Sequence, residues 1–373
     1  MRVFSDAEAG QIGGATYLKG LCAVERGDLG QAARCFSQTA RQWPEVGWFA
    51  YRLAGVLVTM GRHDEADRIF TEEHFLRVTP DLVTDTRILL LGPKYYAALD
   101  SAAREPHASI IDEDLPRFGA AVLLFLSCDS TYFKLYAGAA IASAQTNSAV
   151  DLACHIHIVD PDSAVIEEQT RILRRHPGCA VSFSSERTDL SSRSETERRV
   201  YYACRRFQLL PTILRRAAGA VIIADVDQLL VRGLDSVLAK VRDADVGLIQ
   251  YNGTTLSSPL ATISASAVVA QGTEGARRYF DLVAAYVDYC FERNLWVWHL
   301  DQAALYAAKL MVEARGEPVR IRPLDPAILE STVFDASATG EPAPGTVFWS
   351  ITHSLSSNAA KRELDLFERY NSR

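Results

Sequence analysis

The sequence predicts an α/β protein whose mostly parallel sheet is preceded by an all-α helical-repeat module. Three observations support this fold class. Residues 15–76 repeat at a spacing of 34, and from residue 119 onward short apolar runs alternate with helical patterns. The third observation is the apolar run 220–231, which two carboxylates one residue apart, Asp225 and Asp227, interrupt.

Composition and charge are those of an ordinary globular protein. The 373 residues are 48% hydrophobic and 23% charged, with a net charge of −7. Nucleic acid is therefore not an expected partner, since its binding needs a basic surface. No apolar run approaches the roughly 20 residues of a membrane span, and the first residues lack the apolar core of a signal peptide. We expect a cytoplasmic protein without a transmembrane segment.

The seven cysteines point to the same compartment. They are scattered, odd in number and contain no Cys-x-x-Cys pair. This pattern favours reduced thiols over a disulfide framework or a zinc site.

The N-terminal repeat is typical of two tetratricopeptide repeats, each a pair of antiparallel helices. In each unit a glycine makes the turn, a small alanine allows close helix approach, and a phenylalanine fills the groove. The alternative is an unrelated pair of helical hairpins with a chance spacing. The matched positions are Gly27, Ala32 and Phe36 in the first unit and Gly61, Ala66 and Phe70 in the second.

Two such repeats seldom stand alone, so a further helix over 81–91 is expected to extend the stack. The module is predicted to cover 1–103, and the polar, proline-flanked stretch 104–117 reads as a linker. The concave face of the repeat module is a candidate protein-binding surface. The alternative is that the module serves for packing or dimerisation, in which case the protein would form a homo-oligomer.

Residues 118–373 are predicted to form the α/β domain, because strands and helices alternate as in a doubly wound sheet. Residues 184–197 are polar and are expected to form a loop over the sheet edge. The expected strands are 120–126, 154–160, 180–183, 220–224, 247–251, 262–270 and 347–352. The expected helices are 133–144, 163–175, 201–216, 273–293 and 301–314.

Polar residues follow several of these strands. Asp129 and Tyr132 follow the first, Asp225 and Asp227 the fourth, and His353 the last. Carboxyl ends of parallel strands share one edge of a sheet, so these side chains are expected to line one crevice. A histidine with two carboxylates suits Mn²⁺ or Mg²⁺ and leaves positions open for diphosphate oxygens. Helix capping or turn formation is the alternative role for each carboxylate.

These residues resemble a known family. Residues 119 to about 361 are similar to metal-dependent glycosyltransferases of the GT-A fold, in particular the glycogenin and lipopolysaccharide galactosyltransferase group, which uses UDP-sugars with retention of configuration. The matching segments are Asp129-x-x-Tyr132, the helix with Tyr202 to Phe207, Asp225-Val226-Asp227 (the DxD motif), Leu300-Asp301-Gln302 and His353. Two positions depart from the pattern: Ser264 stands where asparagine is common, and Lys361 lies two places late.

The resemblance implies a role for each position. Asp225, Asp227 and His353 would hold the metal. Asp301 and Gln302 would lie near the acceptor and the anomeric carbon. The donor nucleotide would be bound by Asp129 and Tyr132 at the base and ribose, by Arg206 or Arg205, and by Lys361 at the diphosphate. Trp296, Trp298 and His299 are candidates for an acceptor platform, with core packing as the alternative.

The expected function is that of a metal-dependent glycosyltransferase, transferring a sugar from a nucleotide diphosphate such as UDP to a protein or glycan acceptor. Asp301 would be the base in an inverting enzyme, whereas Gln302 would line the donor's β-face in a retaining one; the resemblance favours retention. Two alternatives remain. A sugar nucleotidyltransferase would need a glycine-rich loop after the first strand, unlike Cys128-Asp129-Ser130-Thr131. A repeat-containing binding protein would carry a decayed sugar-nucleotide site.

Overall fold

A seven-stranded sheet lies at the centre of the molecule, with strand order β3-β2-β1-β4-β7-β6-β8. The computed structural model describes residues 6–71, 93–104, 115–250, 263–331, 344–350 and 370. The first four strands are parallel, β7 runs antiparallel to β4 and β6, and β8 is parallel to β6. The strands are β1 (Val122–Asp129), β2 (Leu152–Val159), β3 (Ala180–Glu186), β4 (Ala220–Ala224), β6 (Val246–Gln250), β7 (Ile263–Ala270) and β8 (Ile321–Leu324). The expected mostly parallel α/β sheet is confirmed.

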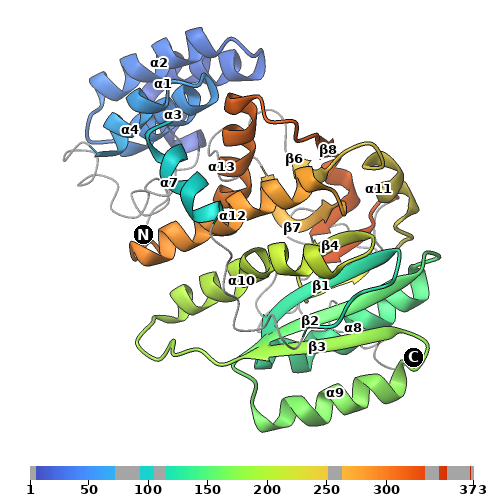
Figure 1. Cartoon of the computed structure of the whole chain (residues 1–373). Coiled ribbons are helices and arrows are strands. Elements are labelled where there is room, and N and C mark those ends of the chain that lie inside the picture. Colours follow the sequence, from blue (N-terminus) through green and yellow to red (C-terminus); the bar gives the residue numbers. More distant parts are fainter. Residues whose placement is uncertain are drawn as a thin grey trace.

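Helices cover both faces of this sheet, as Figure 1 shows. Alternating residues of β1 enter two separate cores, because successive strand side chains point to opposite faces. Leu123 and Phe125 join the core with α10, α12 and α13, whereas Leu124 and Leu126 join the core with α8 and α9. The helices are α8 (Ser130–Asn147), α9 (Ser163–Arg175), α10 (Glu195–Arg216), α11 (Asp235–Lys240), α12 (Glu274–Glu292) and α13 (Leu300–Arg315).

A small second sheet begins directly after the two carboxylates. It has the order β5-β10-β9, formed by β5 (Gln228–Leu230), β10 (Phe348–Ser350) and β9 (Leu329–Ser331), which a 3₁₀ turn (Pro326–Ile328) precedes. The apolar runs on either side of Asp225 and Asp227 are therefore two strands of different sheets. The carboxylates lie in the short connection between them.

The N-terminal part is helical: α1 (Asp6–Glu25), α2 (Leu29–Gln42), α3 (Gly47–Thr59), α4 (His63–Thr71) and α7 (Pro93–Arg104). Gly27 and Gly61 make the turns of two hairpins, each with a φ of +73° that glycine adopts without strain. Ala32 and Phe36 are fully buried between α1, α2 and α3. The hairpins agree with the expected turns, and their assignment as tetratricopeptide repeats stays a prediction.

Several boundaries differ from the sequence-based expectations. The predicted loop 184–197 is wrong at both ends, because β3 continues to Glu186 and α10 begins at Glu195. Ser194 caps α10 in a reciprocal arrangement with Glu197, so the polar residues of this stretch start the helix. The short elements β5, α11, β8 and β9, and helix α7, were not expected from the pattern. The predicted helix 81–91 lies outside the described residues.

Candidate active site

The site lies at the topological switch point of the sheet, where successive strands are added on opposite sides of β1. From β1 the chain moves to β2 and β3, whereas β4 lies on the opposite side of β1. Ligands of open α/β sheets bind at such a switch point, outside the carboxyl ends of the strands. Asp129 is the last residue of β1, and Asp225 and Asp227 follow β4. The structure therefore brings three of the expected carboxylates to the favoured edge.

Arg206 of α10 lies under this edge and is almost completely buried, with 3% of its side chain exposed. Its Nη1 donates to Oδ1 of Asp225. Its Nη2 donates to Oδ2 of Asp301 at 3.1 Å and to the carbonyl oxygen of Ala265 in β7 at 3.2 Å. One guanidinium thus joins β4, β7, α10 and α13, and it links the carboxylate of the DxD motif to that of the Asp-Gln segment.

Asp227 carries the most perturbed carboxyl group of the site. Burial and then the neighbouring Asp225 raise its pKa to about 8. Burial also raises the pKa of Asp225, although Arg206 acts in the opposite direction. Arg206 is already shared with Asp301, so the three carboxylates carry more negative charge than the local cation offsets. A functional group that titrates near neutrality in a crevice marks a candidate site.

The carboxylate pair fits a divalent cation. A bound cation would favour the ionised form of Asp227, against the effects of burial and of the neighbouring Asp225. Oxygen ligands are those that Mg²⁺ and Mn²⁺ prefer. Within the described residues no three His, Cys, Asp or Glu side chains are grouped as a complete metal site. Further ligands would come from substrate, water or residues such as His353, which, like Lys361, lies outside the described residues.

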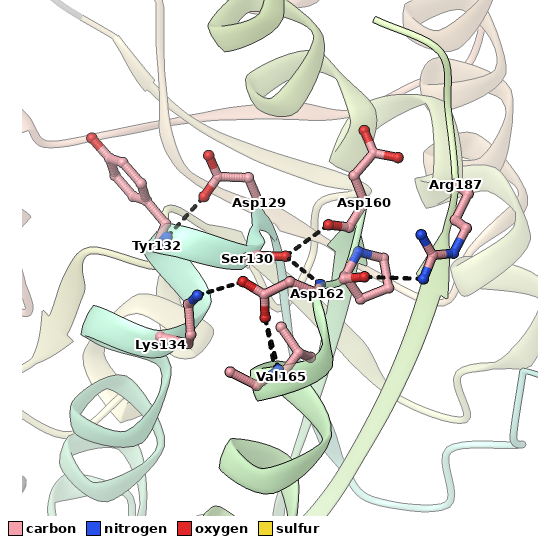
Figure 2. A network of polar contacts seen from close by, with 10 residues as sticks. Asp129, Ser130, Tyr132, Lys134, Asp160, Asp162, Val165 and Arg187 are labelled. Atoms are coloured by element: carbon pink, nitrogen blue, oxygen red, sulfur yellow. Dashed lines mark hydrogen bonds and ion pairs between the residues drawn. The ribbon is translucent and has the colours of Figure 1, made fainter. Parts of the chain in front are cut away.

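Asp129 and Tyr132 stand at the start of α8 beside the pair. Oδ1 of Asp129 accepts the N–H of Tyr132 at 2.8 Å, so this residue caps the helix (Figure 2). Tyr132 is 44% exposed, and burial, then Asp227, raises the pKa of its phenol. The tyrosine ring therefore lies within the electrostatic reach of the carboxylates while remaining accessible to a ligand.

The Asp-Gln segment begins α13. Oδ1 of Asp301 accepts the N–H of Gln302 at 2.8 Å, while Oδ2 accepts from Arg206. His299 is the residue before the helix, so Asp301 is not its N-cap. Only 8% of Asp301 is exposed. Both oxygens of the Asp301 carboxylate are therefore hydrogen-bonded, and Arg206 connects this carboxylate to that of Asp225.

The aromatic residues before α13 divide into two groups. Trp296 stacks on Phe291 and Tyr201, at centroid separations of 4.2 and 6.2 Å, and is a packing residue. Trp298 is 48% exposed and meets the ring of His299 edge-on. His299 has a φ of +69°, an unusual conformation for a non-glycine residue, and it turns the chain into α13. Trp298 and His299 remain candidates for an acceptor platform.

Sequence reasoning missed a buried network beside the site. Glu186, at the end of β3, forms a two-pronged ion pair with Arg205 and accepts from the hydroxyl of Tyr201. His157 of β2 lies 3.5 Å from Glu186. Arg205 is therefore paired with β3, and Arg206 is the arginine of this helix at the carboxylates. The sequence did carry a signal for this network, because His155 and His157 alternate within the expected strand 154–160.

Ser264, which stands at the departure from the family pattern, is a buried residue of β7. Its hydroxyl accepts the N–H of Ser266 at 3.2 Å. Its neighbour Ala265 supplies the carbonyl oxygen that Arg206 binds. The segment therefore contributes backbone contacts to the site.

No protein-family model matches the chain, and no curated protein matches it. Solved structures do. The galactosyltransferase LgtC in complex with donor and acceptor sugar analogues is 11% identical, with a TM-score of 0.47, over 67% of this chain and 95% of that chain. Mouse xyloside xylosyltransferase 1 is 9% identical, with a TM-score of 0.37, over 61% and 96%.

The bifunctional glycosyltransferase WbbM is 14% identical, with a TM-score of 0.44, over 69% of this chain. This chain spans about half (51%) of WbbM. These structural neighbours are glycosyltransferases, at low sequence identity. Among the described residues, no helix combines the length and apolarity that crossing a membrane requires.

Proposed function

We propose that this protein is a glycosyltransferase of the GT-A type, which transfers a sugar from a nucleotide diphosphate donor, UDP-linked, to an acceptor. One observation carries the proposal: Asp225 and Asp227 lie at the switch point of the sheet, and the pKa of Asp227 is raised to about 8. Excess negative charge at this position suits a divalent cation and the diphosphate it would bind.

Each residue then has a task in the reaction. Asp225 and Asp227 would hold Mn²⁺ or Mg²⁺, and such a cation would offset the negative charge of the UDP leaving group. Arg206 is a positioning residue, because it fixes Asp225 and Asp301 in one arrangement. Tyr132 is exposed enough to contact the nucleoside, and Asp129 orients the start of its helix.

The contacts of Asp301 support the proposal that the reaction retains configuration. An inverting enzyme needs a free carboxylate to accept the proton of the attacking hydroxyl. Both carboxylate oxygens of Asp301 are already hydrogen-bonded, Oδ2 to Arg206 and Oδ1 to the N–H of Gln302, so this carboxylate is not free. Gln302 is proposed to line the donor's β-face, and Asp301 to orient the transferred sugar.

The acceptor is proposed to be a glycan that stacks on Trp298. This side chain is 48% exposed and lies three residues before Asp301, at the entrance to α13. Exposed aromatic rings bind the apolar faces of sugars through the same stacking that they use elsewhere. Helices α1–α4 are proposed to add a protein-binding surface, through which a protein acceptor or partner is recruited.

The junction of β1 and α8 argues against the nucleotidyltransferase alternative. That activity requires a glycine-rich loop after the first strand to cradle the triphosphate. Here β1 ends at Asp129 and α8 begins at Ser130, which leaves no residues for such a loop.

The test is hydrolysis and transfer with UDP-, GDP- and CMP-sugars, with and without Mn²⁺. We expect UDP release that depends on Mn²⁺ and is lost in the Asp225→Ala/Asp227→Ala variant. Asp243→Ala, which replaces an exposed aspartate beyond α11, is the control and should retain activity. Equal turnover in the double variant would contradict the proposal. An absence of binding to every nucleotide sugar would favour the non-catalytic binding protein.

A further inference from the structure

We propose that the free edge of the central sheet, together with helix α9, is the interface of a two-fold symmetric homodimer. Strand β3 ends the sheet, and within the described residues β2 is its only neighbour. An unpaired edge strand presents N–H and C=O groups that pair readily with another strand. The proposal is independent of the chemistry at the carboxylate site.

Strand β3 lacks the features that keep a sheet edge from pairing. Proteins guard such edges with lysine, proline, bulges or inward charges. The sequence Ala-Val-Ser-Phe-Ser-Ser-Glu contains no lysine and no proline. Its single charge, Glu186, is the last residue of the strand and is neutralised by its buried pair with Arg205, so it leaves the rest of the edge unguarded.

The helix beside this edge exposes apolar side chains on one flank. Ile166 is 67% exposed and Leu173 is 47% exposed, while Val165 and Ile172 bury the opposite side of α9. Helical spacing puts Ile166, Thr170 and Leu173 on a single stripe. In a right-handed β2–α9–β3 crossover, this stripe faces the β3 edge rather than α8.

The charges of α9 complement those of a second copy running in the opposite direction. The acidic residues lie in the first half of the helix and the basic residues in the second. Glu168 already pairs with Arg171, whereas within the described residues neither Glu167 nor Arg174 forms an ion pair. An antiparallel arrangement brings Glu167 near the partner's Arg174. The same arrangement packs Ile166 against the partner's Leu173.

The dimensions of the two elements allow one axis to serve both. The 13 residues of α9 span about 20 Å and the seven residues of β3 about 23 Å. A two-fold axis perpendicular to the sheet, half a strand spacing outside Phe183 at the middle of β3, would lie near Thr170 at the middle of α9. Continuing the sheet at a strand spacing of about 4.8 Å separates the two α9 helices by about 10 Å, which is helix contact distance.

The charges on α9 favour a second copy of the chain over an anionic membrane as the partner of this surface. Arg171, Arg174 and Arg175 would favour such a surface, but Glu167 lies next to the exposed side chain of Ile166 and would oppose it. A second copy uses both signs of charge.

The test is sedimentation velocity of the full chain over a range of concentrations. We expect a dimer whose fraction rises with concentration, and an association at least about tenfold weaker in Ile166→Asp, because a charge would be buried at the interface. Leu18→Asp changes a residue of similar exposure on α1, 50%, and should leave the dimer unchanged.

A charge exchange tests the antiparallel register. Glu167→Arg should weaken the dimer, and Glu167→Arg/Arg174→Glu should restore it, since the swapped charges meet again. Thr170→Cys should form a disulfide-linked dimer on oxidation with diamide, whereas Arg171→Cys, on the other flank, should not. A monomer at every concentration would overturn the proposal, as would a charge exchange that fails to restore the dimer. Binding of monomers to anionic vesicles that Arg174→Glu abolishes would assign α9 to a membrane instead.

Discussion

Arg206 determines the geometry of the candidate site at the scale of single residues. It is the buried guanidinium that Asp225, Asp301 and the carbonyl oxygen of Ala265 share. Its Nε has no hydrogen-bond partner within the described residues, so the guanidinium is held through its two terminal nitrogens, Nη1 and Nη2. A buried ion pair is costly to break, because the partner left behind stays desolvated.

Replacing Arg206 should therefore destabilise the fold. Arg206→Met would leave Asp225 and Asp301 without their shared cation, and we expect the free energy of unfolding to fall by about 3 kcal/mol. Arg199→Met removes an exposed ion pair on the same helix and should change it by no more than about 0.5 kcal/mol. Urea denaturation of both variants measures this, and equal losses would contradict the assigned role of Arg206.

The raised pKa of Asp227 predicts how the free energy of unfolding depends on pH in the absence of metal. Its pKa of about 8 lies above the value near 4 of an unfolded chain, so the stability it contributes is lost as pH rises from about 4 to about 8. Asp227→Asn removes this loss. We expect the variant to match the wild type near pH 4 and to become increasingly more stable than it as pH rises, by several kcal/mol near pH 8.

The measurement is chemical denaturation in a chelator across that range. His155 and His157, whose pKa values are lowered by burial, destabilise both proteins equally on the acid side, so they cancel in the comparison. A difference between variant and wild type that stays constant with pH would show that Asp227 ionises normally.

At the scale of elements, the approach of β4 to β1 depends on a glycine. A Cβ at Gly219 would lie 2.0 Å from the carbonyl oxygen of Ala121, which belongs to backbone and cannot move aside. The turn from α10 into β4 therefore passes against the start of β1 at a distance that only glycine allows. This contact sets the register in which both strand ends reach the site.

Gly219→Ala should consequently lower the free energy of unfolding by about 3 kcal/mol. Gly119→Ala is the matched control two residues from Ala121, because a Cβ there meets nothing within 4 Å. Urea denaturation distinguishes them, and a Gly219→Ala variant as stable as the control would show that the turn can relax.

The sequence predicted strands better than it predicted their ends. The apolar runs that became β1, β2, β4 and β7 were found because their residues are buried on both faces. The last residues of β3 were missed because Ser184 and Ser185 look like loop, although Ser184 binds two buried histidines. Such a pairing joins positions 27 and 29 residues apart, which no local pattern reveals.

The carboxylates of the candidate site could be predicted from the sequence, but the arginine that joins them could not. Asp129, Asp225 and Asp301 were identified as polar residues at element ends, and the structure places them around one edge or one arginine. The choice between Arg205 and Arg206 could not be made from the sequence. It depends on which side of α10 faces β3 and which faces β4, and that is a tertiary property.

At the scale of the whole molecule, the N-terminal helices share a core with the α/β domain. Tyr51, Leu57 and Leu99 belong to the same apolar cluster as α12 and α13. Arg278 and Arg315 bind Asp100 of α7, at 2.6 and 3.1 Å, and both also contact Glu317. Helix α13, which begins at the candidate site, thus ends at the helical region.

This arrangement predicts a single unfolding transition. Leu99→Ala in α7 removes a side chain that is 4% exposed, and it should destabilise the whole chain by about 2–4 kcal/mol. Calorimetry of the wild type and the variant should show one transition, shifted to lower temperature. Two transitions, of which only one moves, would show that the helices unfold as an independent unit.

The central claim is that the carboxylates after β4 bind a nucleotide diphosphate through a divalent cation. The most direct measurement is a calorimetric titration of UDP into the wild type and into Asp227→Asn, with and without Mn²⁺. The account predicts binding to the wild type that requires Mn²⁺ and is lost in the variant. Binding that is equal in both proteins, or that persists without Mn²⁺, would contradict it.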